Sequence, residues 1–254
     1  ASQLGGDAFL ITHHAKTKEN LAFNGSGEAG HSAVRSAFGD SIDHHGPRSS
    51  TVPGTVSTWF AAHERYGNLP METILAPAIR YAEEGFAATR DFVMRIKFFK
   101  QQFPENDFFA DMGINSNLEI GDLVVQKDLA KTLRLIASQG RDAFYKGAIA
   151  DLIVSGTDGW FNHEDLAKHT TRVEKPLTVD YKGYQVHGQP PPTQGMILME
   201  ELRLIAHKDI KSMSVVDRVH LMVEAKKLGF VDRNEILADP EFTPVDVDRI
   251  LSDD

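Results

Sequence analysis

The chain has no cysteine among its 254 residues, which excludes disulfides, thiolate metal ligands and a cysteine nucleophile. It also lacks any apolar run near the ~20 residues that a membrane span needs. Basic residues are scarce, because 27 Lys and Arg against 36 Asp and Glu leave a net charge of −9, and this argues against nucleic acid as a partner. With 41% hydrophobic residues, the composition is that of a globular protein with one sizeable α/β domain or two small ones.

Patterns of common catalytic and cofactor sites are missing as well. No Gly-x-Gly-x-x-Gly follows a strand pattern, and neither a phosphate loop nor a Gly-x-Ser-x-Gly elbow is present. Residues 25–27 (Gly-Ser-Gly) are superficially similar to the elbow, but no helix pattern follows them. The adjacent His13 and His14 point to opposite faces of a strand, and the helical pair His220 and Glu224 lacks a third ligand. We therefore expect no metal and no cofactor.

The N-terminal part of the chain is predicted to form a hairpin. Residues 8–14 (AFLITHH) are apolar and rich in β-formers, and the pattern returns at residues 21–23 after a polar turn at residues 16–20. Because the front half of the first strand is apolar on both faces, we expect it to be covered on both sides. The Gly-rich residues 24–30 follow as a loop that allows close backbone approach to a ligand or another chain. An ordinary surface loop is the alternative.

The middle of the chain is predicted to be helical. Apolar residues recur at helical spacing from Pro70 to a natural stop at Gly85, and Pro77 within this stretch is expected to kink or restart the helix. The same spacing predicts helices over residues 127–139 and 142–154, each closed by a glycine.

The last third of the chain begins with a helix start and a second hairpin. Asn162, with Asp165 three residues later, is typical of an N-cap followed by an acidic first turn. Residues 176–187 predict the hairpin, the Pro-rich residues 190–195 break the chain before a helix, and a long helix is predicted over residues 215–230. Since neither an internal repeat nor a clear linker is present, we predict a single domain over 1–254.

Several stretches together resemble the gamma-glutamyltranspeptidase family. They are Gly5-Gly6-Asp7-Ala8-Phe9, Thr51-Val52-Pro53-Gly54, 63–70 (HERYGNLP), 75–86 (LAPAIRYAEEGF), 139–151 (QGRDAFYKGAIAD), His163-Glu164-Asp165-Leu166-Ala167, 181–195 (YKGYQVHGQPPPTQG) and 224–240 (EAKKLGFVDRNEILADP). No single stretch is decisive, but they follow the family order and cover nearly the whole chain.

The resemblance implies the αββα sandwich of the N-terminal-nucleophile hydrolases, an α/β (α+β) fold. In that family a precursor cuts itself, and the first residue of the small subunit, a Thr, becomes the nucleophile. Its terminal amine, with a pKa of about 7.7–8.0, can act as general base for its own hydroxyl. This chain begins with Ala1, which has no hydroxyl, and ends at Asp254, before the expected cleavage point. It therefore resembles most of a large subunit with no catalytic residue of its own, whose partner is the small subunit of the same precursor.

One departure from the family changes the expected substrate. Family transpeptidases carry an Arg just after the second strand, which grips the α-carboxylate of the glutamyl group. Here that position falls at or near Gly25. A charge-assisted contact is worth roughly 1.5–3 kcal/mol, so its loss predicts about 10–100-fold weaker glutamyl recognition. We expect a small amide or peptide substrate with a different acyl group, whose distal end contacts Asn24, Gly25, Ser26 and Gly27.

Other interpretations stay open at this point. Arg48 could supply the missing cation, although a structural arginine is the simpler interpretation. The loop at residues 192–195 either lines the pocket or is a rigid turn. The whole protein could also be a catalytically inactive relative that binds or scaffolds, or a precursor that never matures. We expect residues, and any targeting sequence, to precede Ala1, and the compartment is undecided, with the cytoplasm slightly favoured over export.

Overall fold

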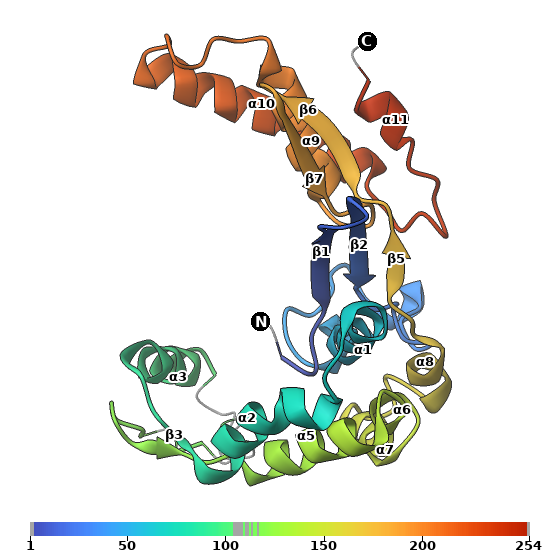
Figure 1. Cartoon of the computed structure of the whole chain (residues 1–254), viewed down its shortest axis with the longest axis vertical. Coiled ribbons are helices and arrows are strands. Elements are labelled where there is room, and N and C mark those ends of the chain that lie inside the picture. Colours follow the sequence, from blue (N-terminus) through green and yellow to red (C-terminus); the bar gives the residue numbers. More distant parts are fainter. Residues whose placement is uncertain (1–2, 104–108, 110–111, 113, 116, 253–254) are drawn as a thin grey trace. The chain divides into compact units, whose positions relative to one another are not determined.

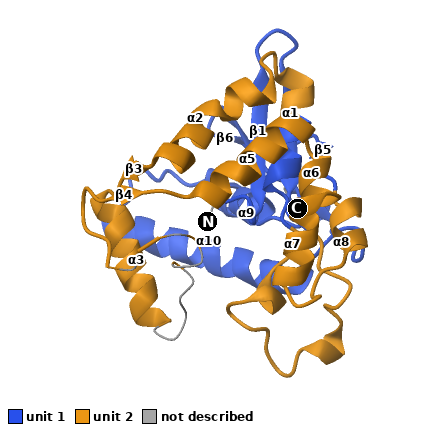
Figure 2. Cartoon of the chain, turned by 90° about the horizontal axis from the view of Figure 1, so that it is seen from below, with its two compact units in different colours: residues 1–27, 53–61, 170–254 blue, residues 28–52, 62–169 orange. Residues whose placement is uncertain are grey.

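A computed structural model describes residues 3–103, 109, 112, 114, 115 and 117–252 of the chain. The chain divides into two compact units (Figure 2). Unit 1 comprises residues 1–27, 53–61 and 170–254, and unit 2 comprises residues 28–52 and 62–169. No helix in the described ranges is long and apolar enough to cross a membrane. A single domain over the whole chain stays a prediction.

Unit 1 contains the predicted N-terminal hairpin. Strands β1 (Ala8–His14) and β2 (Glu19–Gly25) pair antiparallel, and β5 (Arg172–Glu174) pairs with the other edge of β2 (Figure 1). The central strand β2 carries the core of this sheet, because Ala22 and Phe23 are completely buried. The hairpin is therefore confirmed, with β2 as its buried member.

The expectation that the first strand is covered on both sides was wrong for this chain. Three apolar side chains of β1 are exposed: Phe9 by 49%, Leu10 by 37% and Ile11 by 39%. The physical reason is that β1 lies at the edge of the three-stranded sheet, paired only with β2 among the described strands. Apolar composition indicates that a strand needs cover, but it does not tell whether the cover belongs to the same chain.

The C-terminal part of unit 1 is a second hairpin with three helices. These elements are β6 (Leu177–Tyr181), β7 (Tyr184–Gly188), α9 (Gly195–Ala206), α10 (Val215–Ile236) and α11 (Val247–Ile250). The predicted turn is confirmed, since Lys182 and Gly183 have φ values of 50° and 87°, as a two-residue hairpin turn requires. Helix α9 packs on both strands and against α10, which runs six residues past its predicted end at residue 230.

A buried carboxyl group, Glu200, and a half-buried one, Asp232, meet between α9 and α10. The helices approach closely, because a Cβ added at Gly229 would come within 3.0 Å of Ile197 Cγ2. Near this contact, Glu200 of α9 is only 7% exposed and interacts with Asp232 of α10. Burial first, then the hydrogen bond and charge of Asp232 and the charge of Glu201, raise the pKa of Glu200 to about 7. At neutral pH the fold therefore holds this carboxyl close to its midpoint of ionisation.

Unit 2 is mostly helical. Its elements are η1 (Arg35–Ala37), η2 (Pro47–Ser49), α2 (Met71–Glu84), β3 (Phe86–Ala87), α3 (Arg90–Gln102), β4 (Leu123–Val124), α5 (Lys127–Gln139), α6 (Asp142–Tyr145), α7 (Ala148–Gly156) and α8 (His163–Lys168). Helices α2 and α5 pack side by side (Figure 1), and both end as predicted at a glycine with positive φ, Gly85 and Gly140. Helix α1 (Thr55–Tyr66) begins in unit 1 and ends in unit 2.

Two helix predictions in unit 2 need correction. Helix α2 runs through Pro77, its seventh residue, without a restart, because the missing N–H of a proline removes only one intrahelical hydrogen bond. A kink at Pro77 stays a prediction. The single helix predicted over residues 142–154 is instead two helices, α6 and α7. The break falls at Gly147, whose extended backbone ends one helix and begins the next. The predicted N-cap is confirmed, since Asn162 and Asp165 cap α8 reciprocally.

Candidate functional site

The predicted substrate loop begins where β2 ends. Asn24 is only 2% exposed, and its Oδ1 accepts hydrogen bonds from the backbone N–H of Ser26 (3.0 Å) and from Ser26 Oγ (2.8 Å). The backbone N–H of Gly27 donates to Asp7 Oδ1 at 3.3 Å. These bonds turn the chain sharply after the strand and fix residues 24–27 as one structural element of unit 1. Ser26 Oγ donates its hydrogen bond within this turn, and the expectation that it is no catalytic serine stays a prediction.

Gly25 occupies a position with no room for a side chain. A Cβ built there would lie 1.9 Å from Thr58 Oγ1, 3.0 Å from the carbonyl oxygen of Ala8 and 3.1 Å from that of Gly54. Its φ does not lie in the left-handed region, so space rather than backbone strain requires glycine here. Position 25, at or near which the resemblance places a substrate-gripping Arg, is therefore filled by the neighbouring atoms of the protein itself.

The start of helix α1 forms the floor of this site. The carbonyl oxygen of Gly6 accepts hydrogen bonds from Gly54 N (3.1 Å), Thr55 N (3.0 Å) and Thr55 Oγ1 (2.8 Å). These donors belong to the first turn of the helix, which leaves its first N–H groups without intrahelical partners. Two of the stretches that resemble the family, residues 5–9 and 51–54, thus meet in space and bring α1 under the end of β2.

A cluster of buried hydroxyl groups holds Thr58 in place. Thr58 Oγ1 donates to the carbonyl oxygen of Gly54 (3.1 Å) and lies 3.3 Å from Thr171 Oγ1. Thr171 in turn donates to Ser57 Oγ through its backbone N–H (3.1 Å) and its hydroxyl (2.9 Å). Sequence reasoning missed this cluster, because two hydroxyl residues on one helix turn and a third just before the distant strand β5 leave no periodic signal.

The side-chain amide of Asn24 has an unused donor. Asn24 Nδ2 is buried and has no hydrogen-bond partner among the described residues. An unpaired buried donor costs roughly 1–3 kcal/mol, so such groups usually meet a partner, a water molecule or a ligand. Of the four loop residues predicted to contact substrate, Asn24 is therefore the one that offers a free polar group.

The Pro-rich loop between β7 and α9 is a fixed turn of unit 1. Gln189 Nε2 donates to the carbonyl oxygens of Leu10 (2.9 Å) and Phe23 (3.3 Å), which ties the loop to the first hairpin. Thr193 Oγ1 donates to the carbonyl oxygen of Gln189 at 3.0 Å. A Cβ at Gly195 would come within 2.4 Å of that same oxygen. These contacts favour the rigid-turn interpretation of residues 192–195.

Arg48 lies in unit 2 and is engaged there. Its Nε forms an ion pair with Asp43 (3.0 Å), another guanidinium nitrogen donates to the carbonyl oxygen of Ala37, and the guanidinium lies over the rings of Phe38 (5.7 Å) and Trp160 (6.0 Å). These contacts agree with a structural arginine. A substrate role for Arg48 stays a prediction.

Unit 2 fixes the continuation of the substrate loop through two histidine–carboxylate pairs. The completely buried His169 places its Nδ1 at 3.2 Å from Glu28 Oε2, and this hydrogen bond holds the pKa of Glu28 below its usual value despite burial. His31 donates to Asp165 through its backbone N–H (3.0 Å) and its Nδ1 (2.8 Å). Burial alone would raise the pKa of Asp165, but the bonds from Asn162 and His31 outweigh it and lower the pKa.

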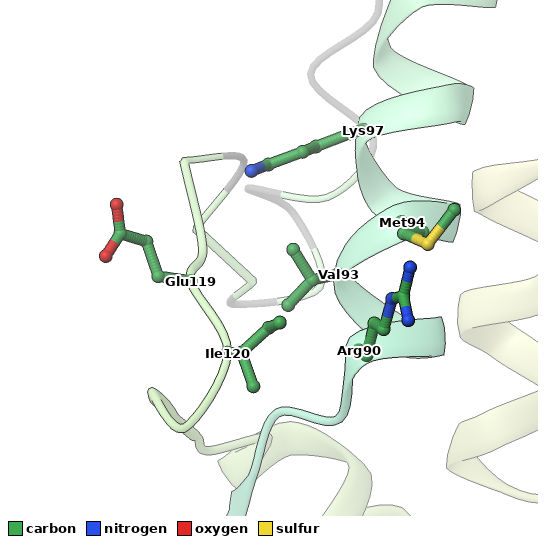
Figure 3. Close-up of a pocket in the computed structure, with 6 residues that line it drawn as sticks. All are labelled: Arg90, Val93, Met94, Lys97, Glu119 and Ile120. Atoms are coloured by element: carbon green, nitrogen blue, oxygen red, sulfur yellow. The ribbon is translucent and has the colours of Figure 1, made fainter.

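Other features of the described residues lie away from this site. A shallow cavity of 420 Å³ in unit 2 is lined by Arg90, Val93, Met94 and Lys97 of α3 together with Glu119 and Ile120 (Figure 3). None of the five predicted site residues lines it. Within the described ranges, no three His, Asp or Glu side chains gather as a metal site would require.

A family model for gamma-glutamyltranspeptidase matches residues 1–254. The chain belongs to the gamma-glutamyltranspeptidase family, and its solved neighbours have the N-terminal-nucleophile hydrolase fold. Fold class and family, both predicted from sequence, are confirmed.

Particular relatives include both glutathione hydrolases and acylases. The glutathione hydrolase-like YwrD proenzyme of Bacillus subtilis is 33% identical over 98% of this chain and 49% of its own length. Gamma-glutamyltranspeptidase of Helicobacter pylori has a TM-score of 0.91 at 28% identity, over 98% of this chain and 76% of that chain. Cephalosporin acylase from Bacillus halodurans has a TM-score of 0.90 at 32% identity, over 98% and 49%. The chain thus spans about half the length of the curated relative and of the acylase.

Proposed function

We propose that this chain is most of the large subunit of an amide-bond hydrolase or acyltransferase whose preferred acyl group is not γ-glutamyl. In the proposed reaction the hydroxyl of an N-terminal Thr on the small subunit attacks the substrate carbonyl, and the terminal amine takes its proton. The amine of the substrate's amide bond then takes that proton and leaves, and the acyl group stays on the Thr as an ester. Water or an acceptor amine attacks this ester and releases the acyl group. None of these catalytic groups belongs to this chain.

The absence of a cation at the end of β2 carries this proposal. At or near Gly25, where the resemblance places the glutamyl-binding Arg, residues 24–27 are uncharged, and a Cβ at Gly25 itself would stand 1.9 Å from Thr58 Oγ1. Without a cation, a substrate α-carboxylate would be desolvated without its charge-assisted partner, at a cost of roughly 1.5–3 kcal/mol. The acylase among the relatives supports an acyl group of a different kind.

This chain would form one wall of the substrate pocket. The unpaired Nδ2 of Asn24 would donate a hydrogen bond to an oxygen at the distal end of the acyl group. Gly25, Ser26 and Gly27 would contact the substrate through their backbone, on a surface that is closely packed at Gly25. A peptide-like or small-molecule amide fits these neutral donors better than a dicarboxylic group does. Arg48 is kept as a second candidate for contact with the substrate.

The exposed apolar edge of β1 supports a partner subunit. Phe9, Leu10 and Ile11 expose between 37% and 49% of their surface, and contiguous exposed apolar patches usually mark interaction sites. Several relatives carry the word proenzyme in their names, which fits a small subunit cut from the same precursor. We propose that this small subunit covers the exposed strand.

Co-expression of both subunits with an amide panel tests the proposal. The matured enzyme is expected to hydrolyse 4-aminobutyryl anilide, which lacks the α-carboxylate, better than γ-glutamyl anilide and better than the carboxylate-bearing oxamate-like and glutaryl anilides. Strong turnover of γ-glutamyl anilide would contradict the altered specificity.

A catalytically inactive binding or scaffolding relative is the competing hypothesis. The N-terminal residue of the mature partner subunit separates the two hypotheses, since Thr, Ser or Cys there can act as a nucleophile. Edman degradation or mass spectrometry of the purified complex reads that residue directly. Any other residue, or one uncut band on a denaturing gel, would favour the scaffold or the unprocessed precursor.

A further inference from the structure

Ser32, His31 and Asp165 form a row of hydrogen-bonded side chains within unit 2. His31 Nδ1 lies 2.8 Å from Asp165 Oδ2, and Ser32 Oγ lies 3.1 Å from His31 Nε2. An ionised carboxylate only accepts hydrogen bonds, so a neutral His31 carries its proton on Nδ1 and leaves Nε2 as the acceptor for the Ser32 hydroxyl. A hydroxyl within about 2.6–3.2 Å of a base that a third group orients is the arrangement of a serine hydrolase.

Asp165 fixes the position of the His31 ring. Its side chain is 2% exposed, and the same Oδ2 atom also accepts the backbone N–H of His31 at 3.0 Å. Burial raises the pKa of Asp165, but the hydrogen bonds that it accepts outweigh burial and keep the pKa below its usual value, so the carboxylate is ionised at neutral pH. A Cβ at Gly30 would come within 2.6 Å of Phe161, so the segment that carries His31 also packs closely on its neighbours.

The Ser32 hydroxyl can be reached from solvent. Ser32 is only partly buried, and the His31 side chain is 47% exposed. The contact of Ser32 Oγ with the carbonyl oxygen of Gly159 is longer, at 3.4 Å, so His31 Nε2 is the better acceptor for the hydroxyl proton. Within the described ranges the backbone N–H of Ser32 makes no hydrogen bond, and the N–H of the nucleophile is a donor that stabilises the oxyanion in serine hydrolases.

We propose that Ser32 is a nucleophile that activated esters acylate, with His31 as its general base and Asp165 as the residue that positions His31. The site belongs to this chain and does not depend on the N-terminal Thr of the proposed function. Ser32 Oγ forms a bond to the ester carbonyl carbon while its proton passes to His31 Nε2. The bond from that carbon to the alcohol oxygen then breaks, and the alcohol leaves with the proton from His31. Water attacks the acyl group, releases it as an acid and restores the Ser32 hydroxyl.

Labelling of the full precursor and of its matured form with a fluorophosphonate tests the proposal. Ser32 Oγ would bond to phosphorus and displace fluoride, and mass spectrometry of the peptides assigns each label to a residue, so a label on the small-subunit Thr is counted separately. Ser32 should react about 100-fold or more faster than Ser49, an exposed serine whose hydroxyl donates to the carbonyl oxygen of Gly46. A Ser32 that reacts no faster than Ser49 would overturn the proposal.

Substitution of His31 separates a general base from a structural residue. His31→Ala keeps the backbone N–H that Asp165 accepts, and it should slow the labelling of Ser32 about 100-fold. Added imidazole should restore part of this rate. The matched control is His163→Ala, which removes another exposed histidine of unit 2 paired with a carboxylate, Asp151 at 2.8 Å, and should label as wild type does. An unchanged rate in His31→Ala, or a loss that imidazole does not restore, would overturn the role of His31.

Asp165→Asn tests the positioning role in two backgrounds. In wild type it should slow the labelling of Ser32 about 10-fold or more, because the ring loses the carboxylate that orients it. In the His31→Ala background it should have no further effect, since Asp165 acts through the imidazole ring. Slowing by the same factor in both backgrounds would show a purely structural role and would overturn the assignment of Asp165.

Discussion

Replacing Glu200 by Gln should make the protein more stable at neutral and alkaline pH. Glu200 lies between α9 and α10, 7% exposed, next to the carboxyl of Asp232. Its Oε2 has no hydrogen-bond partner among the described residues. Glutamine has the same shape as the protonated acid but cannot ionise, so the variant keeps the packing and removes the buried charge.

The size of the effect follows from the pKa of Glu200, which rises from 4.5 to about 7 on folding. Because the folded state holds the proton more tightly, the stabilisation is complete below pH 4.5 and is lost as pH rises to about 7. Each pKa unit corresponds to 1.36 kcal/mol, so the wild type should lose up to about 3 kcal/mol across this window.

Thermal melts of the precursor at half-unit steps from pH 5 to pH 8 measure this effect. The Tm advantage of Glu200→Gln over wild type should be small at pH 5 and should grow to several degrees by pH 8. Glu235→Gln on the exposed surface of α10 makes the same charge change outside the contact between α9 and α10 and is the matched control. Parallel profiles for Glu200→Gln and wild type would refute the reasoning, as would a variant less stable than wild type at pH 8.

Three further substitutions probe the loop and its supports. Asp165→Asn should make the free energy of unfolding less dependent on pH in acid. The lowered pKa of Asp165 means that its carboxylate stabilises the fold above about pH 4, and this stabilisation is lost as pH falls below that value. Thermal melts between pH 3 and 5 measure the slope, and an unchanged slope would contradict the prediction. Glu28→Gln should cost about 1 kcal/mol in urea denaturation, because the buried His169 loses its charged acceptor; no change in midpoint would disprove the pairing. Asn24→Asp keeps the acceptor for the turn but removes the Nδ2 donor, so kcat/KM on the preferred amide should fall about 10-fold, and unchanged kinetics would exclude contact with the substrate.

Local sequence signals predicted the local structure well. The hairpin turn at Lys182-Gly183, the glycine stops after α2 and α5 and the cap of α8 by Asn162 all depend on neighbouring residues only, and each is confirmed. These features need a backbone conformation or a hydrogen bond within a few residues. The residues that cause each of these features are thus its close neighbours in the sequence.

Features that depend on distant contacts could not be predicted in the same way. The closed space at Gly25 arises because Thr58, 33 positions later, packs against it, and composition cannot reveal such a contact. The exposure of Phe9 on β1 could not be predicted either. The same apolar pattern occurs in a strand that its own chain covers and in a strand that a partner chain covers. The family resemblance pointed to position 25, and the structure supplied the physical reason why glycine stands there.

The most direct test of the proposed function is one ratio measured on the wild-type matured enzyme. The two substrates are γ-glutamyl anilide and 4-aminobutyryl anilide, which isolate the contribution of the α-carboxylate to kcat/KM. With no cation among residues 24–27, the carboxylate should bring no benefit, and 4-aminobutyryl anilide should be hydrolysed at least as efficiently. A preference of about 10-fold or more for γ-glutamyl anilide would mean that another cation grips the carboxylate, and it would contradict the account.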